Sequence, residues 1–187
     1  MHTNIQKYGG DFRYVLDKEF KTSKGITVAS GYASLDVINA FKNPFIEVAK
    51  KGGTSRLLLG MAFYEGLGQK KLTAVTNLNA ELKSYDANSG VYVTNGRRYH
   101  GKVYQFEKDV SSNLYVGSSN FSASGTKGNI ECTVPILDNN QKVNLIAFLN
   151  DLYSPSYSVS IDQAEITVPS KKRVVLDRVE LLWSNLN

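Results

Sequence analysis

An alternation of short apolar runs with stretches of helical periodicity constrains the fold of this chain more than any other feature. Residues 26–32 form an apolar run of strand length, and residues 34–49 repeat apolar side chains at the spacing of a helix face. The same order follows in residues 57–62 and 72–82. Two strands that are each followed by a helix are typical of parallel strands covered by helices, so the first half predicts an α/β fold.

The first of these helices has sequence signals at both ends. Ser34 is a good N-cap, and the Lys50–Lys51 pair before two glycines is typical of a helix end. Pro44 interrupts the apolar face, and it predicts that the helix restarts there with Asn43 as a new cap.

The second half of the chain changes character. Short β-like runs at residues 91–93, 99–106, 113–116 and 130–136 are separated by glycine, asparagine and serine, and Asn95–Gly96 is typical of a hairpin turn. A third helix is predicted from about Asn140. Its apolar residues are Val143, Ile146, Leu149 and Tyr153. The whole pattern predicts a mixed sheet flanked by helices.

A length of 187 residues fits one domain. Near the end, residues 166–168 and 174–176 predict short strands, and residues 179–183 predict a short helix. The chain stops abruptly after this apolar tail. We therefore expect residues 1–187 to form a single domain that is a fragment of a longer chain.

Composition excludes several classes of protein. The hydrophobic fraction of 42% and charged fraction of 21% argue against a disordered, collagen-like or disulfide-rich chain. No apolar run approaches the roughly 18 residues of a membrane span. One cysteine and two histidines exclude a disulfide within the chain, zinc sites built from cysteine pairs, and a histidine-rich metal centre. The N-terminus lacks a secretory signal, so we expect a cytoplasmic protein.

The chain is mildly basic. Its 22 lysines and arginines exceed its 17 aspartates and glutamates, which gives a net charge of +5 and a pI of about 9.2. This excess permits a polyanionic partner such as nucleic acid, although many basic proteins bind none.

The most informative stretch is residues 99–106. In a strand, side chains alternate between the two faces of the sheet. His100 and Lys102 are therefore predicted to point the same way, with Gly101 between them facing the other layer.

Two further segments carry polar residues in notable places. Ser118 and Asn120 lie two residues apart in a Gly-Ser-Ser-Asn sequence that follows a predicted strand. Glu131 is a polar residue between apolar neighbours in another predicted strand. Cys132 is then expected to face the opposite way, into the core.

Taken singly, each segment has an ordinary structural interpretation. His-x-Lys occurs often by chance, Gly-Ser-Ser-Asn is usually a plain turn, and Glu131 fits a strand edge that faces water. The joint pattern is more specific. Asn120 lies 18 positions after Lys102, and Glu131 lies 31 positions after His100.

This joint pattern resembles the phospholipase D superfamily, whose signature is His-x-Lys followed by a Gly-Ser-x-Asn turn. It is more closely similar to the metal-independent restriction endonucleases of that superfamily, the BfiI and NgoFVII group, which add a later Glu at similar spacing. The resemblance is specific across residues 99–134 and implies a phospholipase-D-like α-β-α sandwich. The superfamily has an Asp five residues after the Lys, where this chain has Glu107.

The resemblance implies a metal-independent endonuclease that acts on DNA without a cofactor. His100 would attack phosphorus and form a covalent phosphohistidine, because a neutral imidazole avoids repulsion by the charge of the phosphodiester. Lys102 and Asn120 would donate to the non-bridging oxygens in place of a metal ion, and Ser118 would add a hydroxyl donor. Glu131 would accept a hydrogen bond from the far ring nitrogen of His100.

The histidine count bears on the assembly. A second imidazole is needed to protonate the leaving oxygen, yet His2 stands at a terminus that is expected to fray and belongs to no motif. We therefore predict a two-fold homodimer in which both copies of His100 form one composite active site.

These observations predict the catalytic domain of a restriction endonuclease, with DNA recognition on a separate domain of a longer chain. Arg97 and Arg98 are expected to contact the DNA backbone. Two alternatives stay open: a lipid phosphodiesterase or phosphatidyltransferase, and a nucleic-acid-binding dimerisation module without catalysis. No membrane partner is expected, because no amphipathic membrane helix supports one.

Overall fold

A seven-stranded mixed sheet organises the described part of the chain. The structure, a computed structural model, describes residues 1–169. Within them, the strands lie in the order β6-β5-β4-β1-β2-β3-β7. Their bounds are β1 (Gly25–Ser30), β2 (Ser55–Leu59), β3 (Gly90–Thr94), β4 (Lys102–Glu107), β5 (Ser112–Gly117), β6 (Thr133–Pro135) and β7 (Ser158–Ser160).

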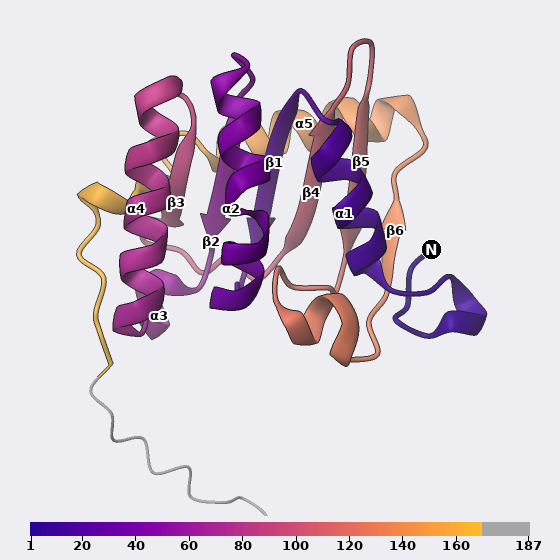
Figure 1. Cartoon of the computed structure of the whole chain (residues 1–187), viewed down its shortest axis with the longest axis horizontal. Helices are drawn as coiled ribbons and strands as arrows, with labels where there is room; N and C mark the ends of the chain where they lie inside the picture. The colour runs from indigo at the N-terminus through magenta and orange to yellow at the C-terminus, as the bar shows by residue number, and fades with distance from the viewer. Residues whose placement is uncertain (170–187) are drawn as a thin grey trace, which may run out of the picture.

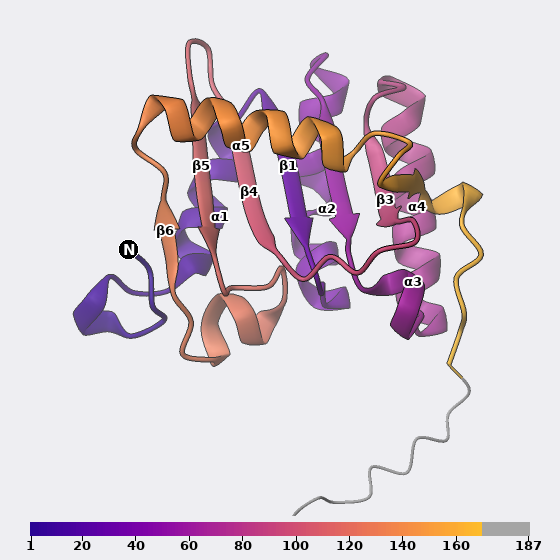
Figure 2. The same cartoon turned by 180° about the vertical axis from the view of Figure 1, so that it is seen from behind.

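Helices cover both faces of this sheet, which confirms the predicted α-β-α sandwich. Figure 1 shows α1, α2 and α4 on one face, and Figure 2 shows α5 crossing the other. The helix bounds are α1 (Phe12–Thr22), α2 (Leu35–Lys50), α3 (Ala62–Glu65), α4 (Gln69–Tyr85) and α5 (Asn139–Leu152). Among the described residues, none of the helices has the length and hydropathy that crossing a lipid bilayer requires.

The direction of the strands brings distant segments to one edge of the sheet. β1 is parallel to β2 and antiparallel to β4, and β4, β5 and β6 are successively antiparallel. The end of β1 therefore lies beside the start of β4, and Ser30 pairs with Lys102. The end of β5 and the start of β6 follow at the same edge. We call this the carboxyl edge of β1.

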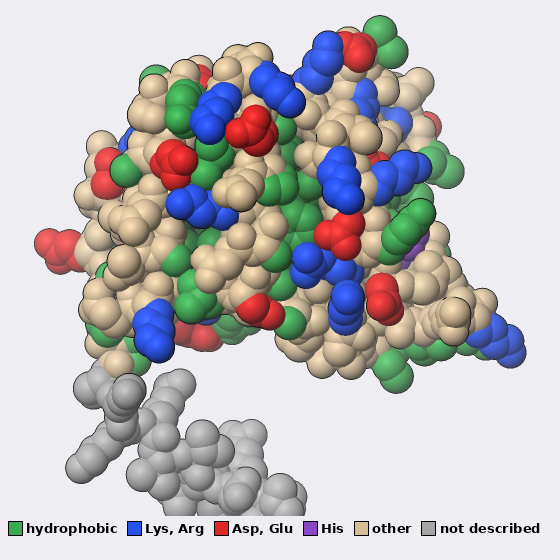
Figure 3. Space-filling model, in the orientation of Figure 1, with side chains coloured by type: hydrophobic (Ala, Val, Ile, Leu, Met, Phe, Trp, Pro, Cys, Tyr) green, Lys and Arg blue, Asp and Glu red, His purple; other side chains and the backbone are tan. Residues whose placement is uncertain are grey.

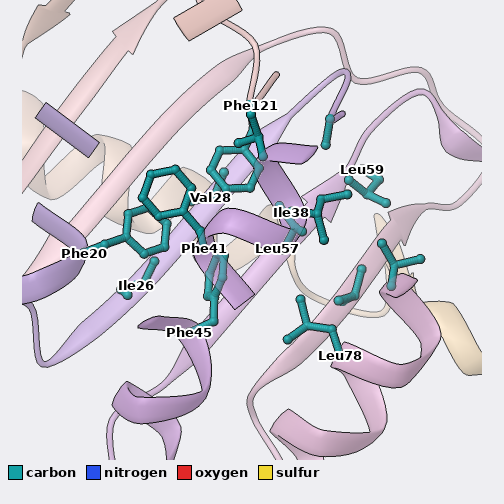
Figure 4. Packing of buried hydrophobic residues seen from close by; sticks show 14 of the residues in the cluster. Phe20, Ile26, Val28, Ile38, Phe41, Phe45, Leu57, Leu59, Leu78 and Phe121 are labelled. Atoms are coloured by element: carbon teal, nitrogen blue, oxygen red, sulfur yellow. The ribbon is translucent and has the colours of Figure 1, made fainter. Parts of the chain in front are cut away.

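The larger core lies between the sheet and the helices α1, α2 and α4, and it holds a cluster of aromatic rings (Figure 4). The ring of Phe20 is centred 4.3 Å from that of Phe41 and 5.0 Å from that of Phe45. Phe121 joins this cluster, with its ring 5.6 Å from Phe41. Because Phe121 follows Asn120 directly, the core anchors the turn that carries one of the predicted site residues.

Helix α2 runs without a break through Pro44, so the predicted restart at Asn43 is wrong. Phe41 and Phe45 both pack into the core, whereas Pro44 lies between them and is only partly buried. The apolar face on both sides of the proline keeps the helix in one piece, despite the hydrogen bond that proline cannot donate.

The smaller core lies between the sheet and α5. Ala29, Leu58 and Val103 pack with Leu149 and Leu152 of this helix and with Tyr153, the residue that follows it. The Tyr153 hydroxyl also donates to the Val28 carbonyl oxygen at 2.8 Å. The predicted third helix is confirmed, although Val143 lies on its exposed side.

Several strand predictions need correction. Asn95–Gly96 forms no hairpin, because β3 pairs with β2 and β7 while β4 pairs with β1 and β5. Residues 130–132 precede β6, so Cys132 is exposed and does not face the core. Residues 166–168 form no strand. The predicted elements at residues 174–183 lie outside the described residues.

Candidate active site

The loop of residues 95–101 crosses the carboxyl ends of β2 and β1 before it enters β4 (Figure 2). The carbonyl oxygen of Gly60 accepts hydrogen bonds from Thr94 Oγ1 at 2.9 Å and from the Tyr99 amide at 3.3 Å. The Gly31 amide donates to the Gly101 carbonyl oxygen at 3.1 Å. These contacts fix the path along which the chain delivers His100 and Lys102 to this edge.

Two glycines make room for this loop. A Cβ at Gly60 would lie 2.7 Å from Tyr99 Cδ1 and 2.8 Å from Tyr99 Cβ. A Cβ at Gly31 would lie 3.2 Å from His100 Cα. A side chain at Gly60 would therefore push the loop away from the strands.

Lys102 is the first residue of β4 and is buried, with 7% of its surface exposed. Its Nζ lies 3.1 Å from His100 Nδ1 and donates to the His100 carbonyl oxygen at 2.6 Å. Burial lowers the pKa of Lys102, and the charge of Glu131 opposes that shift. Within residues 1–169 the ammonium makes no ion pair.

His100 precedes β4 and is exposed. Its ring meets that of Tyr32 edge to face, with the ring centres 5.4 Å apart. An ammonium group has only donors, so a neutral His100 accepts from Lys102 at Nδ1 and carries its proton on Nε2. The predicted pairing of His100 with Lys102 is therefore present, although a loop rather than a strand places the imidazole.

Asn120 is oriented by backbone contacts. Its Oδ1 accepts a hydrogen bond from the Tyr32 amide at 3.2 Å and lies 3.4 Å from Ser30 Oγ. Ser30 Oγ in turn accepts from the Phe121 amide at 3.0 Å. Because the oxygen of the Asn120 amide is held in this way, its NH₂ group is the end available to a ligand. Ser30 also pairs with Lys102, so both donors belong to one corner of the sheet.

Ser118 and Glu131 form a pair of their own. The Ser118 hydroxyl donates to Glu131 Oε2 and accepts from the Cys132 amide at 2.9 Å. Asn129 Nδ2 donates to Glu131 Oε1 at 3.3 Å. Ser118 is predicted to donate its hydroxyl proton to a phosphate oxygen. In the structure, that proton is donated to Glu131 instead. The predicted contact of Glu131 with His100 is not formed among the described residues.

The N-terminal segment supports the loop that carries Glu131. The Glu131 amide donates to the Thr3 carbonyl oxygen at 3.3 Å. Asn4 Nδ2 donates to the carbonyl oxygens of Asn129 at 2.9 Å and Gly125 at 3.1 Å. Asn4 is the residue that sequence reasoning missed. Its one local signal is the tolerance of asparagine for a positive φ, which is 55° here.

His2 is not at a frayed end, because it pairs with Thr133 through two backbone hydrogen bonds. Its ring lies against Phe12 and Tyr115, and its Nδ1 lies 3.3 Å from the Gly9 carbonyl oxygen. These contacts place the His2 imidazole beside α1, where it packs as a structural residue.

The two predicted DNA-contacting arginines lie on the same loop as His100 and are exposed. The guanidinium of Arg98 lies 4.9 Å from the centre of the Tyr64 ring. Figure 3 shows cations and anions interspersed on the face covered by α1, α2 and α4. Arg97 and Arg98 lie within three residues of His100 in the sequence.

Glu107, at the position of the superfamily Asp, lies at the other end of β4 from Lys102. It accepts from Gln105 Nε2 at 3.3 Å and pairs with Gly25 at the opposite edge of the sheet. Glu107 is therefore not part of the candidate site. Within residues 1–169, no three His, Cys, Asp or Glu side chains come together as a metal-binding group.

Comparison with known families identifies the domain. Residues 11–168 match the family described as the NgoFVII restriction endonuclease N-terminal PLD domain. The chain belongs to this family. The match covers more than half of its length. No curated protein matches the sequence.

Two solved structures show the fold of this restriction endonuclease domain family in other settings. Nuc from Salmonella typhimurium, a phospholipase D family member, is 14% identical and superposes with a TM-score of 0.53 over 84% of this chain and 90% of Nuc. Polyphosphate kinase from Porphyromonas gingivalis is 11% identical, with a TM-score of 0.51 over 97% of this chain and 26% of the kinase. Both likenesses support the phospholipase-D-like fold.

Proposed function

We propose that this domain is a metal-independent endonuclease that hydrolyses DNA phosphodiester bonds through a phosphohistidine at His100. The supporting observation is Lys102, a buried cation that touches an exposed imidazole and makes no ion pair within residues 1–169. A buried charge without a counter-charge is costly, and an anionic ligand lowers that cost. The NH₂ group of Asn120 faces the same corner.

The arriving phosphate changes the state of His100. A phosphate oxygen accepts a charge-assisted hydrogen bond from Lys102 and so draws the ammonium away from His100 Nδ1. The freed imidazole attacks phosphorus while Lys102 and Asn120 hold the non-bridging oxygens, where negative charge is concentrated. A nitrogen–phosphorus bond forms, and the bond to the leaving oxygen breaks.

The leaving oxygen takes its proton from an imidazolium, for which we propose the His100 of a second copy. That imidazole, now neutral, removes a proton from a water molecule. The water oxygen bonds to phosphorus as the nitrogen–phosphorus bond breaks, and this step regenerates His100. Ile130, the residue before Glu131, is 81% exposed. An exposed apolar residue next to Glu131 supports a dimer interface there.

Glu131 supports Lys102 rather than forming part of the bond-breaking machinery in this arrangement. Its charge favours the protonated form of Lys102, while Ser118 and Asn129 hold the carboxylate in place. Arg97 and Arg98 contact neighbouring phosphates, so binding weakens as salt rises. Base-specific recognition is assigned to a separate domain of a longer chain.

A plasmid-cleavage assay in excess EDTA tests this proposal. We expect nicking to persist in EDTA and to be lost in His100→Ala. His2→Ala is the matched control, because it removes the other imidazole of the chain and leaves the site intact. Loss of nicking in EDTA would contradict metal independence. Full activity of a sample whose light-scattering mass is that of one chain would contradict the composite site.

A further inference from the structure

Three exposed aromatic rings form a ledge beside His100. Tyr32 follows β1, and Phe63 and Tyr64 belong to α3, so all three stand at the carboxyl edge of β1. Their exposed fractions are 36%, 41% and 40%. We call Tyr32, Phe63 and Tyr64 the aromatic ledge. Nothing in the proposed bond-breaking step uses these rings.

The ledge is continuous with the candidate active site. The ring of Tyr32 meets that of His100 edge to face, at 5.4 Å between centres. The Tyr32 hydroxyl donates to Glu65 Oε1 at 2.6 Å and so ties this ring to α3. On the same helix, the ring of Tyr64 lies 5.5 Å from that of Phe63. One hydrogen bond thus ties the Tyr32 ring to the helix that carries the other two rings before any ligand arrives.

Charges around the ledge distinguish between ligand groups. The carboxylate of Glu65 accepts from the Tyr32 hydroxyl, and such a group repels a phosphate and can accept a hydrogen bond from the edge of a base. Arg98 lies 4.9 Å from the Tyr64 ring, where a guanidinium can stack on a base or hold the next phosphate. Aromatic faces bordered by a cation are typical of sites that stack nucleobases.

We propose that the aromatic ledge binds an unpaired nucleobase next to the phosphate at His100. The inference rests on the proposed function and adds to it a preference for DNA with an unpaired base. A base inside a duplex has both faces covered by its neighbours, so only an unstacked base reaches the ledge. The domain therefore cleaves single-stranded or locally unpaired DNA better than an intact duplex.

The experiment compares Tyr64→Ala with Tyr64→Phe and with Tyr14→Ala, which removes an exposed tyrosine from α1. Cleavage is measured on a single-stranded oligonucleotide and on methyl p-nitrophenyl phosphate, a phosphodiester without a base. We expect Tyr64→Ala to raise KM for the oligonucleotide about 10-fold, the range expected for one lost stacking contact. Hydrolysis of the small diester should not change, and Tyr64→Phe should restore the wild-type KM.

A binding measurement keeps the two proposals separate. In a His100→Ala background, the affinity for the oligonucleotide is compared with that for an abasic oligonucleotide of the same length. We expect Tyr64→Ala to weaken only the first. Equal loss for both, or no loss beyond that of Tyr14→Ala, would overturn the ledge. A wild-type chain that binds the base-containing strand more tightly yet cleaves nothing would instead overturn the proposed nuclease.

Discussion

Each end of strand β4 carries a lysine and a nearby glutamate, and the two pairs differ in how they are satisfied. At the far end, Lys108 forms an ion pair with Glu19 at 2.7 Å, and Glu19 is 4% exposed. Asn113 and Tyr115 donate to the same carboxylate at 2.9 and 2.8 Å. At the carboxyl edge of β1, Lys102 and Glu131 interact only through their charges.

The difference separates a structural pair from a candidate functional one. Glu19 accepts from Asn113 and Tyr115, and Lys108 donates to Thr22 and Ser23 as well as pairing with Glu19, so the pair joins α1 to the β4–β5 turn. Among residues 1–169, the Lys102 ammonium contacts only His100, at two atoms, which leaves one of its three protons for an incoming anion. A buried lysine therefore points to a ligand site when it makes no ion pair within the described residues.

The sharpest test of this comparison exchanges the two lysines for a neutral side chain of similar length. We expect Lys102→Met to lower kcat about 1,000-fold, as expected for loss of a main charge-stabilising donor. We expect Lys108→Met to lower stability instead and to leave kcat of the folded fraction near that of the wild type. Cleavage kinetics give kcat for each variant, and circular dichroism gives the folded fraction by which kcat is corrected. The two measurements together decide between these outcomes. Similar kcat values for the two variants would remove the distinction.

The structural role of the far end is tested by Glu19→Gln, which we expect to lower the free energy of unfolding by about 3 kcal/mol. Burial raises the pKa of Glu19, but hydrogen bonds from Lys108, Tyr115 and Asn113 outweigh it, so the pKa is lowered overall. A lowered pKa stabilises the folded state above the ordinary value of 4.5, and this contribution is lost as the pH falls through the folded-state pKa.

Urea denaturation of the wild type and Glu19→Gln over a pH series measures this contribution. The difference in stability should be largest near neutral pH and should shrink in acid. A difference that stays constant down to the acid limit would show that the Glu19 charge is not the source of the stability.

The loop that carries His100 offers a third test. Close packing holds this loop, whereas an ion pair holds the Lys108 end of β4. We expect Gly60→Ala to lower stability by roughly 1–3 kcal/mol through overpacking against Tyr99, and to lower kcat as His100 moves. Gly68→Ala is the control, since a Cβ there meets no atom within 4 Å. Thermal unfolding and cleavage rates should separate the two variants, and equal behaviour would argue against the close packing.

The smallest effect is expected at Glu131, where the interaction is one of charge alone. Removal of that charge lowers the pKa of Lys102 further, so in Glu131→Gln the ammonium loses its proton at a lower pH than in the wild type. The alkaline limb of the kcat profile should therefore move to lower pH. An equal fall in kcat at every pH would instead support the predicted role of Glu131 in orienting His100.

Much of the fold could be predicted from local patterns. The apolar runs at β1 and β2 and the helical spacing in α2 and α4 concern neighbours in sequence, and hydrophobic burial is sufficient to place them. Predictions failed where a partner distant in sequence decides the outcome. Residues 130–132 lie outside β6, and the Glu131 amide donates to the Thr3 carbonyl oxygen, a contact that no local pattern reveals.

The candidate site divides in the same way. The motif of His100, Lys102, Asn120 and Glu131 was apparent from residue type and spacing, because those features can be read along the chain. Which groups already have partners could not be read in this way. The hydrogen bond of Ser118 to Glu131, the orientation of Asn120 by the Tyr32 amide and the support from Asn4 all join segments that only the folded sheet brings together.

The sequence by itself determined the layers of this protein and the kinds of side chain available for chemistry, since both follow from local hydrophobicity and residue identity. The fold then decides that Lys108 forms an ion pair with Glu19 while Lys102 contacts His100 instead, and that the Tyr32 ring stands beside His100. The physical reason is that hydrogen-bond satisfaction and exposure depend on which surfaces meet, and the direction of the strands sets those meetings.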